Sequence, residues 1–132
     1  QAFIDTNKDN VEFSKEINFL AKAWENYKAI LGQLMTYVKA GKMQMIPLFS
    51  TRILHATSMV YCASLLLDQA ILANKKLSDV PENSTDANFY KGKIATARFY
   101  TLNILPEIIA IKTAIEIGDT SAIDMPEACF NS

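Results

Sequence analysis

The sequence predicts an all-α protein, an antiparallel up-down bundle of three long helices with a short helical piece at one chain end. Apolar residues recur at alternating spacings of three and four over three long stretches, and no useful length of chain alternates with period two. Segments 41–47 and 78–86, which contain glycine, proline and other turn formers, separate these stretches. We expect residues 1–132 to form a single helical-bundle domain.

The first predicted helix covers residues 10–40. Asn10 is expected to cap its start, and Gly41 to end it in the left-handed conformation. Its apolar positions share one stripe along the helix. They are Phe13, Ile17, Leu20, Trp24, Tyr27, Leu31, Leu34 and Val38.

The second predicted helix covers residues 45–76, with Pro47 in its first turn, where the missing N–H has no helical partner. Alternate positions of its stripe become alanine, so a neighbouring backbone can approach closely. Its most apolar part, residues 53–73, is interrupted by His55 and Asp68, so we predict a buried central helix and no membrane span. The stripe is Ile46, Phe49, Ile53, Ala56, Val60, Ala63, Leu67 and Ala70, widened by Met59, Leu66 and Ile71.

The third predicted helix covers residues 86–117. Thr85 or Asp86 is expected to cap it and Gly118 to end it. Pro106 lacks the N–H that would bond to the carbonyl group four residues earlier, so we expect a bend there. The following tail should hold one short turn, with Phe130 packed back against the bundle. The stripe is Tyr90, Ile94, Ala97, Thr101, Ile104, Ile108, Ile111 and Ile115.

Composition excludes some functions. A formal net charge of −1 lacks the basic surface expected of a nucleic-acid-binding protein. Two cysteines, Cys62 and Cys129, make no disulfide framework, and no signal peptide is visible at the start of the sequence. We expect both thiols to be reduced and the protein to be cytoplasmic.

No residue pattern predicts a reactive centre. The single histidine, His55, has no glutamate three residues before it, as a di-metal bundle requires, and is expected to hydrogen-bond at the edge of the core. Neither a nucleophile with an oriented base nor a glycine-rich phosphate loop occurs. We therefore assign no catalytic, cofactor-binding or metal-ligating residue. A small-molecule pocket lined by Trp24, Tyr27 and Met59 is a weaker hypothesis than core packing of these residues.

One block of the third helix resembles a known family. Tyr90-Lys-Gly-Lys-Ile-Ala-Thr-Ala-Arg-Phe-Tyr100, followed by Leu105-Pro106, is similar to the C-terminal helical domain of the large acyl-CoA dehydrogenases, including methylmercaptopropionyl-CoA dehydrogenase-like enzymes. The matching positions are Lys93, Thr96, Ala97, Arg98, Phe99, Tyr100, Leu105 and Pro106.

The resemblance implies a C-terminal fragment of a larger, FAD-dependent enzyme whose flavin-binding segments and catalytic glutamate lie upstream. No position here matches them, so FAD is expected in the parent enzyme and no cofactor in this chain. The implied partners are the dehydrogenase core domains of the parent chain or a second copy, with a role in packing and subunit assembly. The alternative is an independent helical adaptor or regulatory domain that binds a protein partner.

Three residues of the same block are candidates for an interface: Gly92, Arg98 and Tyr100. A glycine inside a helix costs about 1 kcal/mol, and close approach of another backbone would offset this cost. Arg98, beside Phe99 and Tyr100, suits a charge-assisted contact with a carboxylate, including one across a domain interface. The alternative for Arg98 is a solvated side chain.

Overall fold

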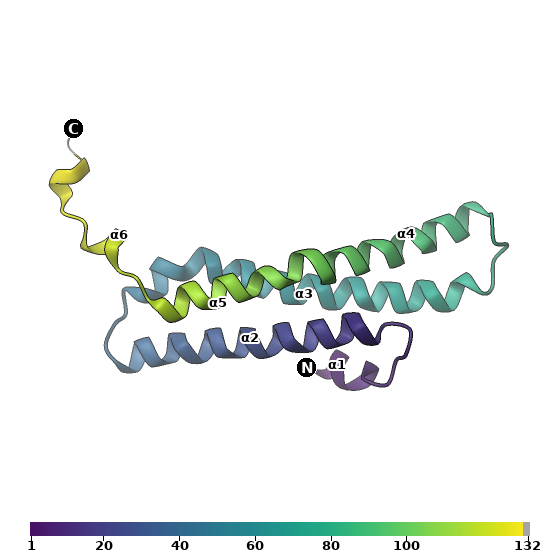
Figure 1. Cartoon of the computed structure of the whole chain (residues 1–132), viewed down its shortest axis with the longest axis horizontal. Helices are drawn as coiled ribbons and strands as arrows, with labels where there is room; N and C mark the ends of the chain where they lie inside the picture. Colours follow the sequence, from purple (N-terminus) through teal and green to yellow (C-terminus); the bar gives the residue numbers. More distant parts are fainter. Residues whose placement is uncertain (131–132) are drawn as a thin grey trace.

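The computed structural model describes residues 1–130, and three long helical runs lie side by side in it (Figure 1). They are α2 (Ser14–Lys39), α3 (Met45–Leu77) and a third run that contains α4 (Thr85–Phe99) and α5 (Ile108–Ile117). Successive runs point in opposite directions, and no strand occurs within residues 1–130. The prediction of an all-α, up-down bundle is confirmed.

The ends of α2 show how local sequence sets helix boundaries. Asn10 does accept a hydrogen bond, from the Phe13 backbone N–H at 3.1 Å, but the helix itself begins only at Ser14. At the other end Gly41 adopts φ +72°, as predicted. The Lys42 N–H bonds back to the Tyr37 carbonyl at 2.9 Å, which satisfies a carbonyl group that the helix end leaves free.

The buried face of α2 follows the prediction over its first half and departs from it over the second. Ile30 and Tyr37 are buried, whereas Leu31 is 40% exposed and Val38 is half-buried. Adjacent helix residues lie about 100° apart, so a wide apolar face can include either member of an adjacent apolar pair. The sequence pattern therefore does not decide between Ile30 and Leu31, or between Tyr37 and Val38. The contact with α5 decides between them, because the Tyr37 hydroxyl donates a hydrogen bond of 2.5 Å to the Ile115 carbonyl.

Helix α3 is the central rod of the bundle, and its predicted bounds agree with the structure to within one residue. It packs most extensively against α4. Ala56, Ala63 and Ala70 are all fully buried, as the alanine pattern predicted. Small side chains at these positions allow neighbouring helix axes to come close.

The third run begins with a cap that the sequence analysis placed wrongly. Ser84, not Thr85 or Asp86, is the cap: its hydroxyl accepts a hydrogen bond from the Ala87 N–H at 3.1 Å. The side-chain oxygen of a capping residue reaches the N–H two or three positions later, and here Ser84 supplies the matching geometry. Gly118 ends the run with φ +64°, as predicted.

Pro106 changes the hydrogen bonding of the third run without ending it. Residues Tyr100–Ile104 form a π-helical turn, in which the Leu105 N–H bonds to the Tyr100 carbonyl five residues back. A 3₁₀ turn, Leu105–Glu107, then leads into α5. Widening and then tightening the turn lets the chain accommodate a residue that has no N–H, and α5 continues beyond it (Figure 1).

Both chain ends carry short helices. Helix α1 (Ala2–Asn7) packs on α2, with Phe3 and Ile4 against the core. Helix α6 (Ser121–Asp124) and the 3₁₀ turn Glu127–Phe130 project away from the bundle (Figure 1). Phe130 is 70% exposed, so the prediction that it packs back is wrong. The exposed segment 121–130 holds no residue that the bundle buries.

Two helical runs, Met45–Leu77 and Thr85–Ile117, are long and apolar enough to cross a membrane by length and composition alone. In this bundle 39% and 28% of their most apolar windows are buried inside the protein. Core helices of water-soluble proteins share this length and composition. The bundle therefore buries part of the apolar surface of these two helical runs, and much of their other apolar surface is exposed.

The two left-handed glycines allow a matched stability test. Gly41→Ala should cost about 1 kcal/mol of unfolding free energy, because alanine disfavours positive φ and nothing lies within 4 Å of its added Cβ. Gly118→Ala should cost about 2–4 kcal/mol, because its Cβ would also collide with the Tyr37 hydroxyl. Urea denaturation measures both. The Gly118→Ala cost should shrink in a Tyr37→Phe background, and equal costs at the two glycines would contradict this account.

Candidate functional site

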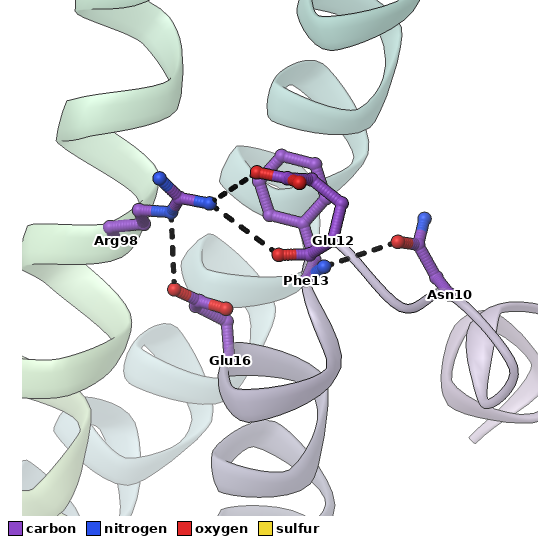
Figure 2. Close-up of polar contacts among 5 residues, drawn as sticks. All are labelled: Asn10, Glu12, Phe13, Glu16 and Arg98. Atoms are coloured by element: carbon purple, nitrogen blue, oxygen red, sulfur yellow. Dashed lines mark hydrogen bonds and ion pairs between the residues drawn. The ribbon is translucent and has the colours of Figure 1, made fainter.

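Arg98 on α4 joins the start of α2 to the third helical run (Figure 2). Its Nη2 lies 2.7 Å from Glu12 Oε1 and donates to the Glu12 carbonyl at 3.4 Å. Its Nε lies 3.3 Å from Glu16 Oε1, and its guanidinium carbon lies 5.3 Å from the centre of the Phe13 ring. One planar cation thus holds two carboxylates and one ring that belong to the same turn of chain.

The ion pair between Arg98 and the buried Glu16 makes the largest contribution of this cluster to the stability of the fold. The Glu16 side chain is only 7% exposed, and a buried carboxylate needs a compensating charge. Glu16 lies in the first turn of α2, where the helix dipole also favours a negative charge. The Glu12 side chain is 55% exposed, so its ion pair with Arg98 is screened by solvent and contributes less.

The carboxylate contact that the sequence predicted for Arg98 is present. The two carboxylates belong to Glu12 and Glu16 of the same domain. These partners lie more than eighty positions away in the sequence, and no local pattern points to them. Since 41% of the Arg98 side chain is accessible, a part in an interface with another domain stays a prediction.

Gly92 and Tyr100, the other two interface candidates, do not join Arg98 in one site. Gly92 is exposed, and a Cβ added there would meet nothing within 4 Å. The close approach of another backbone at Gly92 therefore stays a prediction about a partner. Tyr100 is half-buried beside Cys62 of α3. Their proposed interface roles therefore concern separate surfaces and stay predictions.

The environment of Tyr100 alters its acidity. Burial raises the pKa of its hydroxyl above the ordinary value of 10.0, and the nearby Cys62 and Glu107 raise it further. Next to it Thr101 is fully buried, and its hydroxyl has no hydrogen-bond partner within the part of the chain that the structure describes. Both residues belong to the π-helical turn, where the regular bonding of the helix is already disturbed.

Metal-ligating groups are not clustered in the described part of the chain. Among residues 1–130 no group of three or more His, Cys, Asp or Glu side chains could hold a metal ion. His55 is exposed, so the prediction that it bonds at the core edge is wrong. Cys62 is half-buried, Cys129 is exposed, and neither forms a disulfide.

A cleft of about 340 Å³ opens between α1, α2 and α3. Trp24 and Tyr27 line it, as the pocket hypothesis proposed, but Met59 does not. The Tyr27 and Thr57 hydroxyls form a hydrogen bond of 3.0 Å at its wall. The sequence analysis missed the contribution of α1, because residues 1–7 showed no long apolar stripe. The remaining lining residues are Gln1, Phe3, Ile4, Leu20, Val60, Tyr61 and Ser64.

Removing the Arg98 cation should destabilise the bundle, because it strands the buried Glu16 carboxylate. Arg98→Ala should lower the unfolding free energy by about 2 kcal/mol. Breaking the exposed Glu25–Lys28 pair by Glu25→Ala is the matched control and should change it by less than about 0.5 kcal/mol. Urea denaturation of both variants makes the comparison. Equal effects would show that the cluster is only a surface feature.

The raised pKa of Tyr100 predicts a loss of stability at alkaline pH. Because its folded pKa lies above the unfolded value, the stabilisation is fully present below about pH 10 and disappears as the pH rises through the folded pKa. Absorbance titration of the tyrosinates should show a late-ionising group that Tyr100→Phe removes. A late-ionising group that persists unchanged in the Tyr100→Phe variant would contradict the assignment.

Comparison with known proteins finds acyl-CoA dehydrogenases among the relatives of this chain. Two butyryl-CoA dehydrogenases of Syntrophomonas wolfei are 47% and 42% identical over 97% and 92% of this chain. A broad-specificity linear acyl-CoA dehydrogenase, FadE5, of Mycobacterium tuberculosis is 29% identical over 98% of it. The chain spans only 20–22% of the length of these relatives.

The family comparison covers nearly the whole chain and agrees with the resemblance noted in the Tyr90–Tyr100 block. Residues 1–126 match the family described as acetyl-CoA dehydrogenase C-terminal like. The match includes all three long helical runs and the Arg98 cluster. The chain therefore belongs to the family of C-terminal helical domains of acyl-CoA dehydrogenases.

Proposed function

We propose that this chain is the noncatalytic C-terminal helical domain of a larger FAD-dependent acyl-CoA dehydrogenase, and that it serves packing on the dehydrogenase core and subunit assembly. The observation that carries the proposal is the family match over residues 1–126, to relatives about five times as long. In such a protein most of the chain lies outside this domain. The acyl-CoA substrate, the flavin and the reaction belong to that larger part.

The cleft beside Trp24 does not fit FAD. The pyrophosphate of FAD needs backbone N–H groups at a glycine-rich turn or cationic side chains. The cleft beside Trp24 is lined by apolar, aromatic and uncharged polar residues, and no lysine or arginine lines it. The sequence has no glycine-rich phosphate loop. We therefore place FAD in the parent enzyme and derive no reaction step through this chain.

The physical character of the domain suits a scaffold. Arg98 of α4 is used in ion pairs with Glu12 and Glu16 that hold α4 to the start of α2. Large apolar side chains remain on the outside, among them Leu54 at 66% and Leu72 at 59% exposure. A rigid helical body with uncovered apolar surface is suited to packing against another folded unit. A cytoplasmic location follows from the same proposal, with reduced Cys62 and Cys129.

An independent adaptor or regulatory domain is the alternative function. The same exposed apolar residues favour it, since they would bind a separate protein as well as a neighbouring domain. The reading frame upstream of Gln1 discriminates the two. A frame that encodes only this domain supports the adaptor, and one that continues into a dehydrogenase core supports the assembly role.

Deletion of the domain from the full-length dehydrogenase tests the proposal. Removing it should leave flavin bound to the core, while the oligomer dissociates and the melting temperature falls by several degrees, because subunit contacts are lost. Light scattering, flavin absorbance and thermal unfolding measure these effects. A deletion of residues 121–132 alone is the control and should preserve the oligomer, since residues 121–130 are all exposed. An unchanged oligomer and melting temperature after full deletion would reject the assembly role.

A further inference from the structure

The outer side of α3 carries a row of exposed apolar residues, which we call the α3 outer stripe. It consists of Leu54, Tyr61, Leu65 and Leu72, with exposures of 66%, 62%, 44% and 59%. Their spacings of seven, four and seven residues place them on one side of the helix. Eighteen residue steps at ~1.5 Å each make the stripe about 27 Å long.

Two hollows adjoin this stripe. Tyr61 also lines the cleft of about 340 Å³ that contains Trp24 and Tyr27. Leu72 lines a second hollow together with Phe89 of α4, which is 59% exposed. The α3–α4 hairpin extends past the start of α2 at this end of the bundle, so no third long helix covers it (Figure 1). The α3 outer stripe therefore runs from the cleft beside Tyr61 to the hollow between Leu72 and Phe89.

The composition of this surface indicates the kind of partner. Among the exposed positions of residues 53–74, Asp68 is the only charged one. Depletion of charge around aromatic and aliphatic residues is typical of the core of a protein interface. A helix that lies on a membrane surface instead carries lysine and arginine along its polar face. A cleft lined by Trp24, Tyr27 and Tyr61 suits one large apolar side chain of a protein partner.

We infer that the α3 outer stripe, with the cleft beside Tyr61, docks against the preceding dehydrogenase part of the same polypeptide, which inserts an apolar side chain into the cleft. This inference rests on the proposed function. The relatives are about five times as long as this chain, so roughly four fifths of such a protein lies outside the domain. That large remainder is tethered to the domain, and a tethered partner meets an apolar surface at high effective concentration.

Thiol labelling in the full-length dehydrogenase tests this docking surface. Cys62 and Cys129 are first replaced by serine, and Leu65→Cys or Met35→Cys is introduced. Met35 is the matched control, since it is a 55% exposed apolar residue of α2 outside the stripe. The Leu65→Cys protein should react with a maleimide at least about tenfold more slowly than the Met35→Cys protein, and both should react equally after unfolding in urea. Equal rates in the folded enzyme would overturn the inference.

The same assay identifies other occupants. Protection within one polypeptide should not change on dilution, whereas protection by a second copy would disappear as the oligomer dissociates, which would overturn the inference. Protection that appears only after addition of phosphatidylglycerol vesicles would overturn it in favour of a membrane. If deletion of the domain disrupts assembly while the Leu65→Cys thiol reacts freely, only the stripe assignment fails. If deletion leaves assembly intact, the proposed function itself fails.

Discussion

The close packing of α4 against α3 is the contact on which the rest of the bundle depends. Fully buried alanines lie on both helices, Ala63 and Ala70 on α3 and Ala97 on α4. Small side chains bring two helix axes close together and leave little room for rearrangement. The resulting hairpin provides the surface on which α2 lies, and it determines which sides of α3 face outward.

Polar interactions then hold the two ends of α2 in place on this hairpin. Arg98 binds the start of α2 through Glu12 and Glu16, and the Tyr37 hydroxyl binds its last turn to the Ile115 carbonyl. Each contact joins residues more than seventy positions apart in the sequence. Apolar stripes alone allow helices to slide or rotate against one another, whereas directional bonds at both ends select one arrangement. Arg98, Glu12 and Glu16 thus have a structural use.

The π-helical turn before Pro106 separates these two points of attachment. It lets the third run remain helical from Thr85 to Ile117, so that α4 reaches the start of α2 and α5 reaches its end. It also places Tyr100 beside Cys62 and leaves the Thr101 hydroxyl buried, with no hydrogen-bond partner among residues 1–130. A disturbance of this kind often marks a reactive site. Here it is explained by the missing N–H of proline.

The sequence by itself determined the helical class, the number of long rods, their turns and the family. These features follow from local rules: apolar periodicity sets helix length, and Gly41 and Gly118 end helices because only glycine accepts positive φ readily. Tertiary structure alone decided that Tyr37 rather than Val38 faces the core, that Arg98 pairs with Glu16, and that Phe130 stays exposed. It also revealed the stripe from Leu54 to Leu72 as an uncovered face. The physical reason is that a helical repeat leaves two adjacent stripes nearly equivalent, and only contact with distant parts of the chain selects which one is buried.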